Sequence, residues 1–578
     1  MTETGLTRGN RLIPLLLGAL LLWVVLIVTC AQWTMSPTFD EQNHVARGIA
    51  ILRTGDFRLC FHHPPLANIL EGLPVAWGQS GFSTQMPAWQ PGTKQFLSIW
   101  DASHVTIWSD PAAGLEIIRR ARYPVLLFTL VLGVVVFLWS RELFGPWGGL
   151  LSVTLFALDP TILAHSGLAT TDMAAACTIV LAVYLLRRYL LQPTRQRFVF
   201  AGVGIGLALA AKFSALILLP MVALTLLAFA LHPPRLHGAL FSASARPWAS
   251  RVARAVGLGC AMLVIAGFVL WGIYGFHVES LGSKPGIPVA AHASLKERLP
   301  VPALQYFRGL KAVKKEADGH LAYLNGETDT TGKGWWYYFP VAVAVKTPLP
   351  ELCLLLGILI VLAVPRARAQ LAIPRRELLC LLLPVAIYTL AALGLFGISL
   401  NLGIRHILPI YPFLFILAGG WVMLRLPARY SRPALGLALA AQCAGVLMAY
   451  PNLIAYFNAP AEARSEGYRT LIDSNYDWGQ DLGRLAALQR RDHLYPLAFS
   501  YFGTTPPEAY GITCTSIAGK GLMSRASKLD LTHFHGFLAI SVTDLMGGIG
   551  YTGVDYSFLQ QHRPYARAGK TIILYRLP

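Results

Sequence analysis

Charged residues are scarce in this sequence. Asp, Glu, Lys and Arg make up 13% of the 578 residues, and hydrophobic residues make up 55%. Soluble domains use roughly 25% charged residues, so a chain of this composition has too little charge to cover a water-exposed surface. The scarcity excludes an ordinary soluble protein and predicts an integral membrane protein.

The sequence also lacks a continuous basic stripe, an internal repeat and a low-complexity tract. Its formal net charge is +19, but the basic residues form short clusters between apolar runs. A nucleic-acid-binding protein gathers such residues on one face. The distribution therefore excludes nucleic acid as a partner, and orientation in a bilayer that contains anionic lipids explains it better.

Apolar runs of roughly 17–25 residues predict helices that cross a bilayer. We expect eleven such runs, and hence a polytopic α-helical membrane protein. The predicted spans are 12–32, 121–140, 148–163, 172–190, 198–211, 213–231, 255–275, 349–364, 378–397, 408–424 and 433–450.

The basic clusters predict how the chain is oriented. With eleven spans the arginine-rich connections share one side, whereas the short connections of opposite parity hold only Lys212 and Arg405. By the positive-inside rule the N-terminus is then cytoplasmic. We expect a multi-pass protein of the inner or plasma membrane, with loops 33–120 and 276–348 and the segment 451–578 on the extracytoplasmic side.

The last part of the chain has a different composition from the rest. Residues 451–578 contain one helical pattern, "DLGRLAALQRR", and short apolar runs typical of buried strands, such as "HGFLAISV". They predict a small extracytoplasmic α/β domain that follows a transmembrane module of residues 1–450. Cys60 and Cys514 are the two external cysteines, and a disulfide between them stays an open alternative.

Ionisable residues recur at the outer ends of the predicted spans. Such groups are costly beside hydrocarbon unless they are paired or face a watery cavity, so each is a candidate functional residue. The set mixes acids with bases, as a site that holds an anionic phosphate beside a general base requires. It comprises Asp40, Glu41, His62, His63, Asp172, Lys212, Lys346, Arg405 and His406.

Several motifs arrive in the order found in one enzyme family. "FDE", "HPPL", "ALDPTILAHSGLATTDMAAACTIVLAVYLL", "GIGLALAAKFSALILLP" and "RHILPIYP" resemble the GT-C glycosyltransferases of the protein O-mannosyltransferase and aminoarabinose-transferase type, glycosyltransferase family 39, over residues 10–430. "DSNYDWGQDLGRL" is similar to a segment of bacterial members. The resemblance implies transfer of a sugar, with inversion, from a polyprenyl-phosphate carrier to a protein, lipid or glycan acceptor on the extracytoplasmic face.

An inverting displacement needs one carboxylate that takes the proton of the acceptor. The resemblance implies that Asp40, the first acid of the "DE" pair, is this base. Glu41 would bind the acceptor or tune Asp40. Alternatively, or in addition, the two acids begin an interfacial helix as its N-terminal cap.

The leaving phosphate needs cationic or hydrogen-bonding donors. Arg405 presents a planar fork that suits phosphate oxygens, and His406, Lys212 and His63 are further candidates. The alternatives are an interfacial anchor for Arg405 and a snorkelling side chain for Lys212 or Lys346.

The remaining candidates concern the acceptor and the loops. His62 precedes "HPP" and Asp172 follows "ATT", so both are expected to contact the acceptor or to organise their loops, with helix capping as the alternative for Asp172. Asp477 and Trp478 pair a carboxylate with an aromatic face, as acceptor sites for sugars do. Their alternative is a helix N-terminus favoured by the dipole.

A cofactor is not evident from the sequence. Glu41 and His62 could hold a divalent metal, but no spacing here is a recognised ligand motif. The competing functional class is a transporter or flippase of a lipid-linked or anionic substrate. It would show inverted repeats with broken helices at the membrane midplane, whereas the charges of this chain gather at one face.

Overall fold

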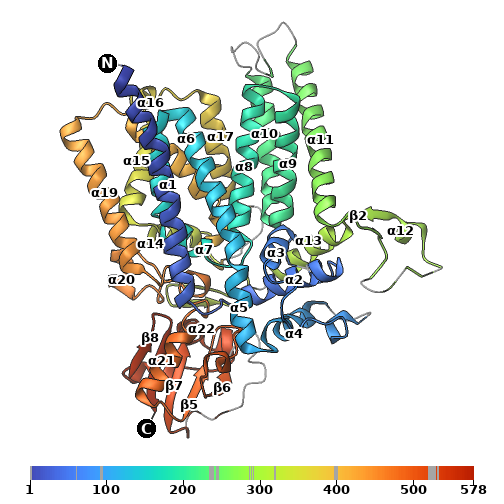
Figure 1. The fold of residues 1–578 in the computed structure, drawn as a ribbon, viewed down its shortest axis with the longest axis vertical. Helices are drawn as coiled ribbons and strands as arrows, with labels where there is room; N and C mark the ends of the chain where they lie inside the picture. Colours follow the sequence, from blue (N-terminus) through green and yellow to red (C-terminus); the bar gives the residue numbers. More distant parts are fainter. Residues whose placement is uncertain are drawn as a thin grey trace.

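The computed structural model describes residues 3–577, with gaps at 60–61, 91–94, 233–239, 242–246, 285–286, 288, 291, 318–319, 396–400, 519–528, 530 and 532. A bundle of long helices carries a smaller β-sheet unit at one end (Figure 1). The N-terminal end of the first helix lies at the opposite end of the bundle. Cys60, one partner of the disulfide considered above, falls outside the described residues.

Six helices of the described chain are long and apolar enough to cross a membrane. A seventh span results if α15 and α16, which meet at a bend of 108°, are counted together. The protein is therefore a multi-pass helical membrane protein, and the count of eleven spans stays a prediction. The six spans are Leu12–Thr34, Pro111–Ala157, Asp172–Leu191, Phe213–Leu231, Trp248–Ile273 and Ala428–Ala449.

Most of the predicted apolar runs coincide with individual helices. The exception is the division between the predicted spans 121–140 and 148–163, which falls inside helix α6, where Gly145 (φ +74°) precedes Pro146 and interrupts the helical conformation. The bundle helices are α1 (Glu3–Thr34), α6 (Tyr123–Ala157), α8 (Asp172–Leu191), α9 (Arg195–Ala211), α10 (Leu218–Leu231), α11 (Trp248–Ile273), α15 (Leu349–Ala363), α16 (Pro365–Leu371), α17 (Arg375–Ala392), α18 (Ile410–Ala418) and α19 (Ala428–Ala449).

Small residues let the bundle helices approach closely, as membrane packing favours. A Cβ at Gly419 would lie 2.2 Å from Ser140 Oγ and 2.7 Å from the carbonyl oxygen of Gly148. Ser152 Oγ donates to Ser140 Oγ at 2.8 Å. Helix α6 therefore packs directly on the segment that follows α18, which fixes the position of the "RHILPIYP" region at the start of α18.

The predicted external loop 33–120 folds into short helices at the sheet end of the bundle (Figure 1). Helix α2 crosses α3 with almost no space between them, because a Cβ at Gly48 would lie 2.0 Å from the carbonyl oxygen of Asn68. This close crossing brings the polar faces of both helices to one place. The helices are α2 (Glu41–Thr54), α3 (Leu66–Gly72), α4 (Gln95–Trp108) and α5 (Pro111–Ala121).

The segment 276–348, predicted to be the second external loop, is less regular. Its strands form two separate antiparallel pairs, β1 with β2 and β3 with β4. The elements between α11 and α15 are β1 (Val278–Ser280), α12 (Leu295–Arg298), β2 (Pro300–Pro302), α13 (Leu304–Ala317), β3 (Ala322–Leu324), β4 (Glu327–Asp329) and α14 (Tyr338–Lys346).

The C-terminal unit contains one five-stranded sheet of order β6-β5-β7-β9-β8. Strand β5 runs parallel to both β6 and β7, and β9 runs antiparallel to β7 and β8. The buried pattern of β7 and β9 explains why both are near-continuous apolar runs in the sequence. The elements are α20 (Ala459–Ser465), α21 (Leu482–Asp492), β5 (Leu497–Ser500), β6 (Thr515–Ala518), β7 (Gly536–Ser541), α22 (Val542–Thr552), β8 (Ala566–Ala568) and β9 (Ile572–Leu577).

A buried lysine fastens the C-terminal part to the bundle. Lys346, at the end of α14, donates to the carbonyl oxygens of Ile454, Tyr456 and Asn475 at 2.7, 2.6 and 2.7 Å. Its ammonium also lies 4.7 Å from the ring centroid of Phe457. Lys346 thus holds the connection between α19 and the sheet.

We expect Lys346→Met to lower the thermal midpoint of unfolding, because it leaves three buried carbonyls without a donor. An unsatisfied buried group costs about 1–3 kcal/mol. Unfolding in detergent, followed by fluorescence or light scattering, measures the change. The control is Lys333→Met, since Lys333 is exposed. Equal midpoints for Lys346→Met and the wild type would contradict this role.

Candidate functional site

Four charged residues that are distant in the sequence meet at the sheet end of the bundle. Asp40 immediately precedes α2, and Asp172 is the first residue of α8. Lys212 separates α9 from the short 3-10 helix η2 (Phe213–Ile217), and Arg405 lies in η3 (Ile404–Ile407). Each therefore lies at or near the end of a helix. There the regular pattern of backbone hydrogen bonds stops, and a side chain can point across the bundle.

These residues alternate in charge. Arg405 Nη1 lies 3.1 Å from Asp40 Oδ2 and 3.6 Å from Asp172 Oδ2. Lys212 Nζ lies 2.5 Å from Asp172 Oδ1. Thr170 Oγ1 donates to Asp172 Oδ2 at 3.2 Å. We call Asp40, Asp172, Lys212 and Arg405 the charge cluster; because each charge has a partner of opposite sign, the cluster is stable beside the membrane.

The four side chains differ in their access to solvent. The side chain of Asp40 is 28% exposed, that of Arg405 is 11% exposed and that of Asp172 is 1% exposed. Asp172 is fully enclosed by its partners and orients the two cations. Asp40 is the acid of the cluster that a substrate can reach.

Glu41 occupies a different environment from its neighbour Asp40. Arg122 Nε and Nη2 donate to the two carboxylate oxygens of Glu41, each at 2.7 Å. The backbone amides of Ala169 and Thr38 donate to the same carboxylate at 2.9 and 2.7 Å. Glu41 is fully buried, so its lone pairs are directed to protein donors and it joins the start of α2 to the bundle.

The proposed pairing of Glu41 with His62 around a metal finds no support in this geometry. His62 Nδ1 lies 2.8 Å from Arg47 Nη2, and a guanidinium repels a cation. The carboxylate of Glu41 is saturated by Arg122. Over the described ranges, no group of three or more His, Cys, Asp or Glu side chains is arranged to hold a metal ion. The residues present therefore do not fit a divalent metal.

Neutral histidines adjoin the charge cluster. Burial, with a smaller contribution from nearby cations including Lys212, holds the pKa of His63 and of His406 well below the usual range. His63 stacks on His44 with ring centroids 5.3 Å apart. Among the described residues, Arg405 Nε, His406 Nε2 and His63 Nδ1 are buried nitrogens near the cluster that have no hydrogen-bond partner. Those that carry a proton can donate to the oxygen atoms of a ligand.

The "DSNYDWGQD" segment contacts the charge cluster through an aromatic side chain. The guanidinium carbon of Arg405 lies 4.3 Å from the ring centroid of Trp478. Asp477 is buried and accepts from the backbone amides of Gly479 and Thr543 at 3.2 and 3.0 Å. Trp478 is thus placed at the site, whereas Asp477 shapes the loop that carries it.

Residues 116–271 match the family model described as dolichyl-phosphate-mannose-protein mannosyltransferase. The predicted resemblance is confirmed. The matched segment includes Asp172 and Lys212 of the charge cluster. No curated protein sequence matches the chain.

Three solved structures match this chain in the structural comparison. ArnT from Cupriavidus metallidurans, bound to undecaprenyl phosphate, gives a TM-score of 0.47 at 14% identity, covering 99% of this chain and 98% of ArnT. AglB from Archaeoglobus fulgidus, with an inhibitory peptide and a dolichol-phosphate, gives 0.45 at 12% identity, covering 98% and 74%. The Pmt1-Pmt2 complex of S. cerevisiae with its sugar donor gives 0.34 at 19% identity, covering 46% and 33%. Because all three TM-scores lie below 0.5, the resemblance rests on the family match.

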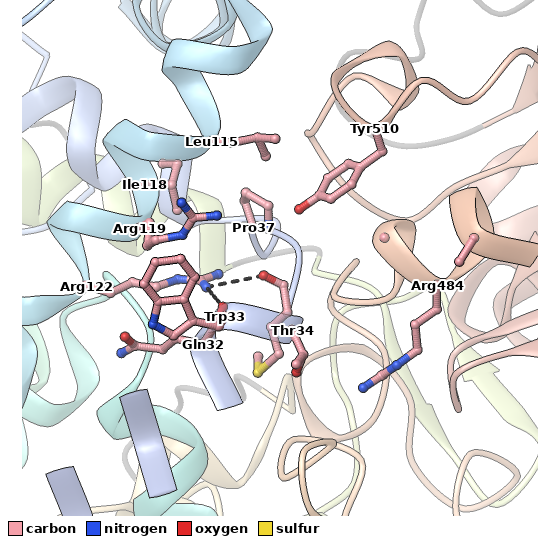
Figure 2. Close-up of a pocket in the computed structure, with 13 residues that line it drawn as sticks. Gln32, Trp33, Thr34, Pro37, Leu115, Ile118, Arg119, Arg122, Arg484 and Tyr510 are labelled. Atoms are coloured by element: carbon pink, nitrogen blue, oxygen red, sulfur yellow. Dashed lines mark hydrogen bonds between the residues drawn. The ribbon is translucent and has the colours of Figure 1, made fainter. Parts of the chain in front are cut away.

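A cavity of about 420 Å³ lies beside the site, where the end of α1 meets α5 and α21. Figure 2 shows Arg119 and Trp33 on one side of it and Tyr510 and Arg484 on the other. Arg122 forms part of its wall, and no member of the charge cluster lines it. The cavity therefore adjoins Arg122, the partner of Glu41, and is not lined by Asp40.

Several residues of the site carry no recognised motif. Arg122 follows α5 directly, and the only signal for it is its place after Arg119 and Arg120 at the edge of an apolar run. His44, Asn68 and Glu71 lie on α2 and α3, where the pattern shows polar residues but not that the helices cross. Asn68 Nδ2 lies 2.9 Å from His44 Nδ1 and donates to Glu71 Oε2 at 3.2 Å.

We expect the stability of Glu71→Gln to exceed that of the wild type progressively as the pH rises. Burial raises the pKa of Glu71 from 4.5 to about 8, so between these values the unfolded chain loses a proton that the folded protein keeps. Folding of the wild type therefore weakens from about pH 5 to pH 8, and a neutral amide removes this dependence.

Thermal midpoints of both proteins across this pH range measure the effect. The exposed Glu327 offers the matched control, because Glu327→Gln alters a carboxylate that is already in water. A constant difference between Glu71→Gln and the wild type at every pH would show that Glu71 is ionised in the folded protein.

Proposed function

We propose that this protein is an inverting glycosyltransferase that moves a sugar from a polyprenyl-phosphate carrier to a protein, lipid or glycan acceptor. The observation that carries the proposal is the pair of Asp40 and Arg405, 3.1 Å apart, in a polar cluster at one end of a membrane bundle. It places a reachable carboxylate beside a cation that suits a phosphate ester. The family match over residues 116–271 supports the same class of reaction.

Asp40 is proposed as the general base. The acceptor oxygen or nitrogen attacks the anomeric carbon, its proton passes to Asp40, and the bond from the anomeric carbon to the phosphate oxygen breaks. The phosphate departs with the electron pair as the lipid monophosphate. One displacement of this kind inverts the anomeric configuration, and Asp40 is exposed enough to meet the acceptor.

Arg405 is proposed as the principal phosphate ligand. Its unpartnered Nε and the unpartnered nitrogens His406 Nε2 and His63 Nδ1 are the donors or acceptors that this region offers to a ligand. The monoanionic phosphodiester of the donor competes with Asp40 for the guanidinium of Arg405. Donor binding then loosens Asp40 from its ion pair, so that the base is released only when a leaving group is present.

Lys212 and Asp172 are proposed to support the site electrostatically. Lys212 Nζ pairs with Asp172 Oδ1 at 2.5 Å, and Asp172 Oδ2 also lies 3.6 Å from Arg405 Nη1. Asp172 therefore fixes the direction of Arg405, while Lys212 offsets its charge and adds positive potential for the phosphate. Glu41 acts by holding the start of α2, through Arg122, and not on the substrate.

We place the site and the C-terminal unit on the extracytoplasmic side and the N-terminus in the cytoplasm. The positive-inside pattern of the basic clusters supports this orientation. The arrangement in Figure 1 agrees with it, because the N-terminal end of α1 and the sheet lie at opposite ends of the bundle.

A purified sample supplied with a polyprenyl-phosphate sugar is expected to release free carrier phosphate in the presence of an acceptor. A transporter or flippase would move the donor between leaflets and leave its glycosidic phosphate bond intact. The opposite result would establish transport instead. In that case free carrier phosphate stays at the background level with donors of several sugars, while the donor lipid moves from one leaflet to the other.

We expect Asp40→Asn to lower turnover at least about 100-fold, the smaller loss typical of a missing general base. Donor binding should not weaken, because Arg405 loses a competitor for the phosphate. Initial rates and a titration with polyprenyl phosphate separate the two effects. Asp101→Asn, an exposed change in α4, is the control. Wild-type turnover in Asp40→Asn would remove Asp40 from the mechanism.

We expect Arg405→Ala to weaken binding of the lipid monophosphate at least about tenfold, since a charge-assisted contact in an enclosed site is lost. Arg405→Lys keeps the positive charge but not the planar fork. Its affinity for the lipid monophosphate should therefore lie between that of the wild type and that of Arg405→Ala. Arg469→Ala, at an exposed arginine, controls for net charge. An unaltered titration for Arg405→Ala would contradict the assignment of the phosphate ligand.

A further inference from the structure

Trp478 contacts Arg405 and the residue before Asp40 through different parts of the residue. Its ring covers the guanidinium of Arg405 at 4.3 Å. Its carbonyl oxygen accepts from the backbone amide of Phe39, the residue before Asp40, at 3.0 Å. One residue of the C-terminal part thus reaches both chain segments whose side chains form the proposed catalytic pair.

The contact with the segment before Asp40 extends over several residues. The backbone amide of Ser36 donates to the carbonyl oxygen of Gln480 at 2.9 Å. Thr504 Oγ1 donates to the carbonyl oxygen of Phe39 at 3.2 Å. Phe39 also stacks on Phe502, with ring centroids 5.0 Å apart. The chain that leads from α1 to Asp40 is therefore bound to the C-terminal part along its length.

The segment that carries Arg405 is held from the same side. Asn475 Oδ1 accepts from the backbone amide of Ile404 at 3.0 Å, and Ser474 Oγ donates to the carbonyl oxygen of Leu402 at 2.8 Å. Asn475 Nδ2 in turn donates to Tyr338 Oη at 2.9 Å. The backbone on the N-terminal side of Arg405 thus has its polar groups satisfied by the "DSNYDWGQD" segment.

The loop around Trp478 is itself rigid. Gly479 has φ +90°, and a Cβ there would lie 2.8 Å from Tyr501 Oη, so the turn requires glycine. Asp481 accepts from the backbone amides of Lys570 and Thr571, both at 3.0 Å. Trp478 is 1% exposed, which leaves its ring one orientation. A rigid, buried aromatic face can fix a guanidinium without neutralising it.

We infer that Trp478 is a positioning residue for the donor site, whose ring holds Arg405 and whose carbonyl holds the segment before Asp40. The inference rests on the proposed function, because it assigns Arg405 to the donor phosphate. Arg405 already pairs with Asp40 and faces Asp172, and the ring of Trp478 adds a contact to the guanidinium without adding a further negative charge. The segment 473–481 is then a component of the site.

The test is a titration of the full-length protein in detergent with a polyprenyl phosphate that carries no sugar. We expect Trp478→Leu to weaken binding about tenfold, the order of a desolvated cation–π contact, and Trp478→Phe to weaken it less, because a ring face remains. The KM for the sugar donor should rise with little change in kcat. Trp139→Leu removes an equally buried tryptophan elsewhere in the bundle and should leave donor affinity unchanged.

A double variant decides whether Trp478 acts through Arg405. If Trp478 acts through Arg405, adding Trp478→Leu to Arg405→Ala weakens binding of the lipid phosphate no further, because the effects of interacting residues on the binding free energy are not additive. Full additivity, or wild-type binding by Trp478→Leu, would overturn the inference. If Trp478→Leu does not fold, Trp478→Phe takes its place. Its effect on lipid-phosphate binding is then compared in the protein that keeps Arg405 and in Arg405→Ala.

Failure of the proposed function gives a different result. In that case Arg405→Ala binds the lipid phosphate as the wild type does, or the wild type does not bind it, and the inference falls with the function. When Arg405→Ala weakens binding and the Trp478 variants do not, the assignment of Arg405 stands and only the role of Trp478 is lost.

Discussion

The charge cluster is the constraint on which the rest of the structure depends. Four charges beside a hydrocarbon boundary are tolerable only when each has a partner, because removing an isolated charge from water costs several kcal/mol or more. Arg405 between Asp40 and Asp172, and Lys212 against Asp172, meet this requirement. In this arrangement the starts of α2 and α8, the end of α9 and η3 lie together.

Two adjacent acids serve different purposes because the backbone turns between them. Glu41 begins α2 and faces inward onto Arg122, where a saturated, buried ion pair fixes the entry of the helix. Asp40 lies just outside that helix and faces the cluster. A rigid neighbour of this kind lets the more exposed acid keep a defined direction, which a base needs before a substrate arrives.

The C-terminal part is built into the site and does not stand apart from the bundle. Lys346 ties its connection to α14, and Asn475 and Trp478 reach the segments that carry Arg405 and Asp40. The membrane helices alone can fix the positions of the segments that carry Asp40 and Arg405 only through the helix termini. These termini are the least restrained parts of a helix. Hydrogen bonds from an external loop supply the missing restraint.

Composition and apolar runs were enough to identify a multi-pass helical membrane protein, since bilayer thickness imposes a length that a sequence shows directly. The motifs around Asp40, Asp172, Lys212 and Arg405 identified the residues of the cluster, because charges at span ends are rare and costly. The sequence assigned the base to Asp40 only through the family resemblance. It could not show that Glu41 faces Arg122, place Trp478 on Arg405, or find Arg122. Those relations join residues far apart in the chain, and only the packing of helices and the external loop decides which side chains meet.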